Sequence, residues 1–215
     1  MSLFRRTPST LRVAYTGLAP FYDAVVPLLS SRARTLGQTW LDVKDGDVVL
    51  DVGTGTGLAL KELVDTNPTG WTEGVDRTPA MLHRARRQLS PMPHTRYGLR
   101  QADATALPYP KDTFDAVFSS YFLDVLPTPQ MRPALREMRR VLHPNGRLVL
   151  VTLSPPQHSI ERAWAALAHY AWPLLGGDRP INSRRFLRKE KFSVTDHTTR
   201  CQAGLRSAIT RSIIL

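Results

Sequence analysis

Hydrophobic and polar positions follow two alternating periods along the middle of the chain. Short apolar runs typical of buried strands occur at 48–50, 71–76, 97–102, 114–121 and 147–153. Between them, apolar residues recur every three or four positions, which predicts helices at 58–64, 79–89 and 130–142. Strands that alternate with helices at this spacing predict a parallel sheet covered on both faces.

The two ends of the chain follow other patterns. Before residue 47, apolar side chains at helical spacing are interrupted by Pro20 and Pro27, which predicts two or more short helices. Beyond residue 155, the sequence predicts an aromatic helix at 159–172 and closing strands at 192–201 and 207–215. A length of 215 residues suits one compact unit. We therefore predict a helical cap at 1–45 and a main domain at 46–215.

A glycine-rich loop follows the first strand of this pattern. Asp51-Val-Gly-Thr-Gly-Thr-Gly57 stands where a strand turns into a helix, at the carboxyl edge of the expected sheet, where open α/β folds bind ligands. The dinucleotide fingerprint is Gly-x-Gly-x-x-Gly, and here the third glycine comes one position early. No Gly-Lys-Ser/Thr follows, as a phosphate-binding P-loop would require. The spacing therefore disfavours both of these phosphate-binding loops.

This loop and the motifs after it resemble those of the class I S-adenosylmethionine-dependent methyltransferases. The resemblance covers roughly residues 45 to 155, through segments 49–57, 74–82, 101–108, 114–115 and 135–146. By pattern the chain is similar to the ubiquinone and menaquinone biosynthesis methyltransferases and to bacterial phospholipid N-methyltransferases, which share the Tyr22-Asp23 signature. The resemblance implies a doubly wound, mostly parallel seven-stranded sheet of the Rossmann-like α/β class, with a C-terminal antiparallel strand and an N-terminal helical cap. Residues 46–215 would form the methyltransferase domain, with 155–215 on the acceptor side.

The resemblance also implies which residues hold the cofactor S-adenosyl-L-methionine and its product S-adenosyl-L-homocysteine. Asp76 would accept both ribose hydroxyls, a task that suits two carboxylate oxygens. Asp103 would accept from the adenine amino group, and the Ala104 N–H would donate to a ring nitrogen. The other implied contacts are Asp51, Gly53, Thr54 and Gly55 in the loop, Arg77 and Met81 beside the adenine, Ser119 near the sulfonium, and Tyr22 in the cap. Structural alternatives remain, namely turn or cap positions for the acids and packing for Met81 and Tyr22.

No general base is evident in the sequence. Because this cofactor carries an activated methyl group, the protein mainly aligns a nucleophile and excludes water. The enzymes of this class that methylate amino groups of nucleic acids have an Asn- or Asp-Pro-Pro-aromatic motif after the fourth strand, where this chain has Ser119-Ser-Tyr-Phe-Leu-Asp124. The catalytic residue is therefore left unknown. Tyr121 and Asp124 are candidates to orient an acceptor, or they pack like Phe122 and Leu123.

The charge of the chain is unevenly distributed. Lys and Arg number 29 against 18 Asp and Glu, which gives a formal net charge of +11. Residues 1–40 hold five basic and one acidic residue, 41–159 hold 14 and 13, and 160–215 hold ten and four. The expected cofactor core is thus nearly neutral. The excess at the two ends either attracts anionic membranes, nucleic acids or acidic molecules, or is an ordinary basic surface. The aromatic helix is either a peripheral membrane anchor or a helix packed on the sheet, and together with the charge it favours a membrane surface.

Cysteine and histidine usage removes several classes of protein. A single cysteine, Cys201, excludes an internal disulfide or a thiolate cluster, and we expect it to be packed. The six histidines lack the i, i+4 spacing of a helical metal site, so no metal is expected, and carboxylate-bound magnesium is the alternative left open. The sequence shows neither a signal peptide nor a run of about 18 apolar residues. We therefore expect a cytoplasmic protein, with peripheral association at the inner face of the membrane.

These observations lead to one principal hypothesis and three alternatives. The principal hypothesis is methyl transfer to a lipophilic or phosphate-bearing acceptor at a membrane surface, either a phospholipid amine or a quinone ring carbon. The alternatives are methylation of a soluble small molecule, a nucleic-acid-associated module that binds the cofactor without turnover, and a nicotinamide-dependent oxidoreductase.

Overall fold

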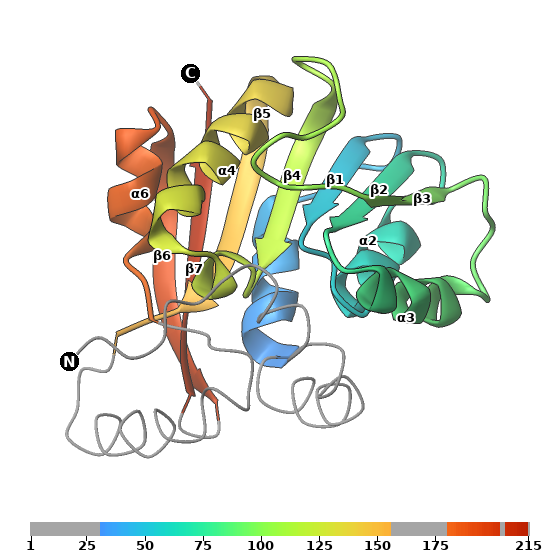
Figure 1. The fold of residues 1–215 in the computed structure, drawn as a ribbon, viewed down its shortest axis with the longest axis horizontal. Coiled ribbons are helices and arrows are strands. Elements are labelled where there is room, and N and C mark those ends of the chain that lie inside the picture. Colours follow the sequence, from blue (N-terminus) through green and yellow to red (C-terminus); the bar gives the residue numbers. More distant parts are fainter. Residues whose placement is uncertain (1–30, 156–179, 203–204, 215) are drawn as a thin grey trace.

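The computed structural model describes residues 31–155, 180–202 and 205–214. Over these residues seven strands form one sheet in the order β3-β2-β1-β4-β5-β7-β6 (Figure 1). The strands are β1 (Val48–Val52), β2 (Trp71–Asp76), β3 (Tyr97–Gln101), β4 (Phe114–Ser120), β5 (Leu142–Leu153), β6 (Ser193–Gln202) and β7 (Leu205–Ile213). Strands β1 to β5 pair in parallel, whereas β7 runs antiparallel to both β5 and β6. The mostly parallel sheet with antiparallel closure is confirmed.

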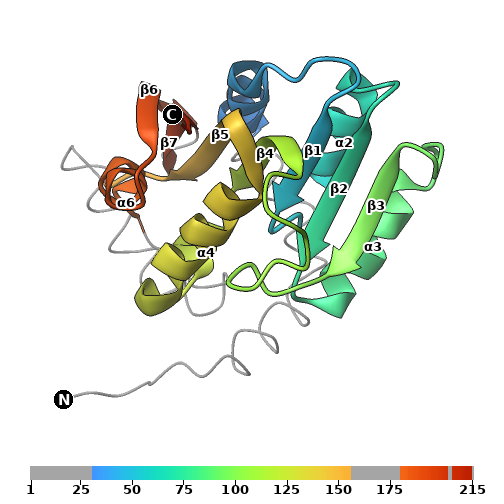
Figure 2. The same ribbon diagram turned by 90° about the horizontal axis from the view of Figure 1, so that it is seen from above.

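Helices cover both faces of the sheet. They are α2 (Leu58–Thr66), α3 (Pro79–Leu89), α4 (Thr128–Val141), α6 (Ser183–Lys189), the short 3₁₀ helix η1 (Leu123–Val125) and a helix at 31–41. Helices α4 and α6 lie on one face, and the helix at 31–41 lies on the other with α2 (Figure 2). Helix α3 packs beside α2, against β2 and β3.

Strand β1 shows why the sequence folds into this layered arrangement. Leu50 and Val52 belong to the core cluster that includes α4, whereas Val49 belongs to the cluster that includes α2 and the helix at 31–41. A central parallel strand is buried on both faces, so its apolar residues form a continuous run. Asp51 interrupts this run at 1% exposure. A carboxylate at such a position requires polar partners, because burying a charge without them costs free energy.

The predicted elements agree with the structure, with local differences. Helix α4 begins two residues earlier than predicted, at Thr128. The predicted turn at 144–146 lies within β5, where the partners of β4 jump from Leu142 to Arg147 and Asn145 has a φ of 63°. The prediction that Cys201 is packed is wrong, because it lies exposed on β6, the edge strand of the sheet.

Some expectations fall on residues that the structure does not describe. They include Tyr22, the helices before residue 31 and the helix at 159–172. The division of the chain at residue 45 stays a prediction. Within the described ranges, none of the helices has the length and apolar character that crossing a bilayer requires.

Candidate functional site

The glycine-rich loop after β1 turns sharply at Gly53, where φ is 75°. This left-handed conformation favours glycine, which has no Cβ to clash with the backbone. A Cβ at Gly53 would lie 2.5 Å from the ring of Phe122, which contacts the loop from the segment after β4. The N–H groups of Gly53 and Thr54 both donate to the Val75 carbonyl of β2, at 2.9 and 3.0 Å. The loop is therefore fixed between the end of β2 and an aromatic ring.

Asp76 ends β2 and braces the next part of this loop. Its Oδ2 accepts from the Gly55 N–H at 3.0 Å, and its Oδ1 accepts from the Thr78 N–H at 2.7 Å. Burial raises the pKa of Asp76, and the hydrogen bonds from Thr78 and Gly55 oppose this without cancelling it. Each carboxylate oxygen has a further lone pair. Asp76 can therefore hold the loop and still accept hydrogen bonds from a ligand.

Asp51 lies at the start of the loop with one carboxylate oxygen satisfied. The Thr54 hydroxyl donates to Oδ2 at 2.7 Å. Among the described residues, Oδ1 is buried without a hydrogen-bond partner. Burial raises the pKa of Asp51 to about 7, the Thr54 hydrogen bond lowers it, and the nearby Asp76 carboxylate raises it further. A cationic donor at Oδ1 would therefore be strongly favoured there.

Asp103 follows β3 and is oriented by Thr105. Its Oδ1 accepts from the Thr105 N–H at 2.9 Å and from the Thr105 hydroxyl at 2.7 Å. Burial by itself raises the pKa of Asp103, but Thr105 and Arg77 together bring it below the usual value. The ion pair from Arg77 Nη1 to Asp103 Oδ2 spans 3.7 Å between half-exposed side chains and is worth about 0–1 kcal/mol. Asp103 is therefore ionised at neutral pH.

Ala104 and Met81 complete this end of the site. Ala104 is buried, and within the described part of the chain no group accepts a hydrogen bond from its N–H. Met81 lies in the first turn of α3 with 3% exposure, as either a core residue or a ligand neighbour would. The structure thus brings together the segments after β1, β2 and β3, as the sequence predicts.

Ser119 and Asp124 are both engaged with the backbone. The Ser119 hydroxyl, at the end of β4, donates to the Val52 carbonyl at 2.9 Å and so ties β4 to β1. Asp124 is buried in η1, and both of its carboxylate oxygens lie 3.1 Å from the Leu153 N–H. These contacts connect the ends of three strands.

Tyr121 adopts a left-handed conformation with φ of 54°, which is unusual for a bulky residue. Its N–H donates to the Val151 carbonyl at 2.7 Å, and its hydroxyl shares a 2.8 Å hydrogen bond with the Ser207 hydroxyl. The ring is partly buried in the core cluster beside β5. This turn brings the next residue, Phe122, against Gly53, a contact that sequence reasoning did not identify.

The donors and acceptors of this edge suit the groups of the expected cofactor. An ammonium group matches the unsatisfied oxygen of Asp51, a ribose diol matches Asp76, and an adenine edge matches Asp103 with the Ala104 N–H. The left-handed Gly53 lets the backbone approach a ligand closely. Within the described ranges, no three His, Cys, Asp or Glu side chains lie together in a way that could hold a metal ion.

Comparison with known proteins gives sequence relatives over most of the chain. The family described as a methyltransferase domain matches residues 49–146. The ubiquinone/menaquinone biosynthesis C-methyltransferase UbiE of Geobacter sulfurreducens is 32% identical over 187 residues, covering 82% of this chain and 72% of the relative. The malonyl-[acyl-carrier protein] O-methyltransferase of Halorhodospira halophila is 39% identical over 127 residues, covering 57% of this chain and 41% of the relative. The chain therefore spans less than half the length of the second relative.

A solved structure shares the fold. The 1,6-didemethyltoxoflavin-N1-methyltransferase of Burkholderia thailandensis, with bound 1,6-didemethyltoxoflavin and S-adenosylhomocysteine, superposes with a TM-score of 0.75. The match covers 100% of this chain and 93% of the other at 15% identity. At this identity, the likeness concerns the architecture and not the substrate.

Proposed function

Because the chain belongs to the S-adenosylmethionine-dependent methyltransferase family, we propose that it methylates a ring carbon of a lipophilic quinone precursor at a membrane surface. The observation that carries this choice of acceptor is the 32% identity to a quinone C-methyltransferase over 82% of the chain. The match to the malonyl-carrier enzyme covers a smaller part of both proteins. The quinone reaction is therefore the better supported of the two.

We assign the cofactor to the carboxyl edge of the sheet. When bound, S-adenosylmethionine supplies a methyl group on a positively charged sulfonium. Asp51 would hold the amino group, Asp76 the ribose hydroxyls, and Asp103 with Ala104 the adenine edge, since each offers the complementary donor or acceptor. The remaining proposed contacts are Gly53, Thr54, Gly55, Arg77, Met81 and Ser119, with Tyr22 from the cap.

The protein contributes chiefly position and exclusion of water. The polar side chains at the end of β4 and just after it hold neighbouring strands together, since the Ser119 hydroxyl donates to the Val52 carbonyl and the Tyr121 hydroxyl shares a hydrogen bond with Ser207. Tyr121 and Asp124 would then act as positioning residues that set the place of the Phe122 ring over the loop. Aligned reactants make up much of the rate gain when the transferred group is already activated. A partly buried aromatic ring also suits a lipophilic acceptor.

The described surface supports an association with anionic lipid. Helix α6 exposes Arg184, Arg185 and Arg188 on its outer side. Each basic residue near an anionic leaflet contributes about 1 kcal/mol. We propose that this cationic face keeps the enzyme near the membrane that holds its acceptor.

The acceptor can be identified by following a labelled methyl group. The purified protein is given methyl-labelled S-adenosylmethionine together with a demethylated menaquinone in detergent, phosphatidylethanolamine vesicles, malonyl acyl carrier protein or RNA. We expect label in the quinone fraction alone. Label found only in the phospholipid, the carrier protein or the RNA would overturn the proposed acceptor, and so would the absence of label everywhere. The Asp65→Ala variant, which removes an exposed carboxylate on α2, is expected to retain the activity.

A further inference from the structure

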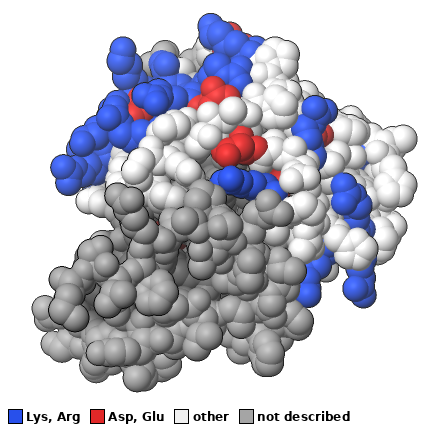
Figure 3. Space-filling model, in the orientation of Figure 1, with Lys and Arg blue, Asp and Glu red and all other residues white. Residues whose placement is uncertain are grey.

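A basic pocket of about 500 Å³ lies between α4 and α6, away from the glycine-rich loop. Its charged lining comprises six cationic residues, Lys111, Arg136, Arg139, Arg140, Lys189 and Lys191, and two acidic ones, Asp112 and Glu190. The pocket adjoins the first residues of β4 and β5, whereas the loop follows the last residue of β1. The two sites therefore lie at opposite ends of the parallel strands. On the surface, Lys and Arg side chains gather over α6 and α4 (Figure 3).

The two acidic residues of the pocket already have partners. Asp112 forms an ion pair with Lys111 at 3.1 Å. Glu190 is buried and accepts from Arg132 Nε, which comes from the first half of α4. Neither carboxylate is therefore free to neutralise the remaining cations.

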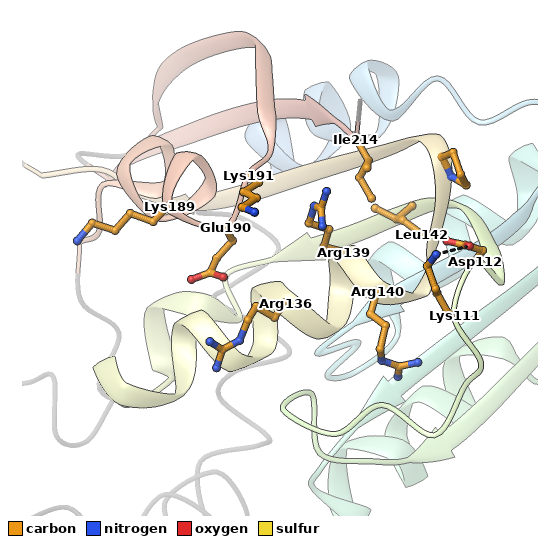
Figure 4. Close-up of a pocket in the computed structure, with 11 residues that line it drawn as sticks. Lys111, Asp112, Arg136, Arg139, Arg140, Leu142, Lys189, Glu190, Lys191 and Ile214 are labelled. Atoms are coloured by element: carbon orange, nitrogen blue, oxygen red, sulfur yellow. Dashed lines mark ion pairs between the residues drawn. The ribbon is translucent and has the colours of Figure 1, made fainter.

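Arg140 is satisfied as well. It pairs with Glu137 at 2.7 Å, and it donates to the carbonyls of Leu107 and Tyr109 at 2.9 and 2.8 Å. Figure 4 shows Arg140 pointing away from the other cations of the pocket. Among the described residues, no ion pair or side-chain hydrogen bond involves the four remaining cations, Arg136, Arg139, Lys189 and Lys191.

Arg139 is the most deeply placed of these four. Its Nε is buried without a hydrogen-bond partner in the described part of the chain. The side chain extends from α4 towards Lys191 and Ile214 (Figure 4). A buried polar group without a partner is unfavourable, so a ligand that accepts a hydrogen bond from this Nε would be favoured. Arg136 lies three residues earlier on the same helix, where like charges repel.

Lys191 lies at a backbone position that favours glycine. It follows Glu190, the residue that caps the C-terminal end of α6, and has a φ of 59°. Its N–H donates to the Arg188 carbonyl at 3.2 Å. The Phe192 N–H then reaches back to the Leu187 carbonyl at 3.1 Å, which closes the helix end. Glycine is the common residue at such a left-handed helix end. A lysine there is strained, yet it adds a cation to the pocket.

Helix dipoles explain only part of this charge. The last turns of α4 and α6 contain Arg139, Arg140, Arg188 and Lys189, and cations are favoured near carbonyl ends. Lys191 lies beyond the end of α6, and none of the described backbone carbonyls accepts a hydrogen bond from Arg139. The pocket therefore holds more positive charge than the helix ends require.

From these contacts, we propose that the α4–α6 pocket binds a phosphate group. A phosphate monoester carries about −1.5 to −2 charges at neutral pH and has three acceptor oxygens. Such a ligand suits several unpaired cations better than a ligand with a single carboxylate does. The volume lies in the range of small-molecule sites. The phosphate belongs either to a soluble molecule or to a lipid headgroup. This site does not depend on the proposed acceptor, because it lies at the other end of the parallel strands.

Thermal unfolding in phosphate tests the site without any methyl transfer. At matched ionic strength, inorganic phosphate at about ten times its Kd should raise the Tm above that in chloride by roughly 3–6 °C. Arg139→Gln should abolish this rise. Lys191→Gly should also abolish it while folding at least as stably as the wild type, because glycine relieves the left-handed strain. The double variant Arg86→Gln with Arg87→Gln removes two exposed charges from α3 and should keep the full rise.

Vesicle flotation then identifies the source of the phosphate. Vesicles of phosphatidylcholine with phosphatidic acid are compared with phosphatidylcholine alone, and inorganic phosphate serves as the competitor. Binding that requires phosphatidic acid and that Lys191→Gly removes supports a lipid headgroup. A phosphate-dependent Tm rise without flotation supports a soluble phosphate compound. The proposal is overturned if phosphate does not raise the Tm of the wild type, or if it raises the Tm of Lys191→Gly by the same amount.

Discussion

Asp76→Ala is expected to weaken the binding of S-adenosylhomocysteine by more than about 100-fold. The substitution removes the proposed acceptor of the ribose hydroxyls together with the braces to the Gly55 and Thr78 N–H groups. Hydrogen bonds to a charged group contribute about 1.5–3 kcal/mol each, and about 1.4 kcal/mol corresponds to tenfold in Kd. Two such bonds to the ligand therefore account for the loss. Calorimetric titration of the purified variant measures it.

Two matched variants separate this effect from a general loss of structure. Asp76→Asn keeps the shape and one acceptor oxygen, so its affinity should fall between those of the wild type and Asp76→Ala. Asp65→Ala removes an exposed carboxylate whose ion-pair partner among the described residues is Lys61 on the same helix, so its affinity should be unchanged. Near-normal binding by a folded Asp76→Ala would show that the ribose is held elsewhere.

Asp51→Asn is expected to stabilise the ligand-free protein above pH 7. Burial raises the pKa of Asp51 to about 7 in the folded state, whereas the unfolded chain has the ordinary value of 3.8. Between these values the folded protein holds a proton that the unfolded chain has lost. Its stability therefore falls as the pH rises through this window, by at most about 1.4 kcal/mol per pH unit. Asparagine has no charge to bury and keeps an oxygen for the Thr54 hydroxyl.

Thermal unfolding of both proteins from pH 5 to pH 8 measures this difference. The two Tm values should be similar at pH 5, and the variant should be the more stable by several degrees at pH 8. Parallel curves for the two proteins would contradict the titration of Asp51 in this range. Both proteins carry the same six histidines, so the difference between the two curves isolates the contribution of position 51.

The same substitution should have the opposite effect on ligand binding. The ionised carboxylate is the form that attracts an ammonium group, so the wild-type affinity for S-adenosylhomocysteine should rise with pH up to about 7. The rise is at most tenfold per pH unit, since binding below the pKa must release a proton. Asp51→Asn should bind more weakly, with that rise abolished. If the variant is more stable than the wild type and also binds the ligand as tightly, Asp51 does not belong to the binding site.

The order of the strands and helices could be predicted because the spacing of apolar residues differs between strands and helices. Strand β2 and helix α3 begin and end where the sequence indicates, since apolar runs and the Pro79 start are local signals. That the acidic residues at the strand ends lie at one edge of the sheet could also be predicted, because parallel strands all end there. The partners that orient Asp103 and Asp76 depend on loop geometry, which single residues do not specify.

Two features could not be predicted because they depend on residues distant in the sequence. Phe122 meets Gly53 only through the left-handed turn at Tyr121, and the segment 119–124 offers no periodic signal for it. The basic pocket joins Arg139, from a segment that is nearly neutral by residue count, to Lys191 from the basic end. Counting charge along the chain divides this cluster between two segments, whereas the fold of α4 against α6 unites it.

The position of bound cofactor decides whether the carboxyl edge of the sheet is the site of methyl transfer. A crystal structure of the chain with S-adenosylhomocysteine should show the ribose hydroxyls within hydrogen-bond distance of Asp76, the amino group at Asp51 and the adenine beside Asp103 and Ala104. A ligand bound elsewhere, including in the α4–α6 pocket, or a ribose without contact to Asp76, would contradict the assignment of this edge of the sheet as the site of methyl transfer.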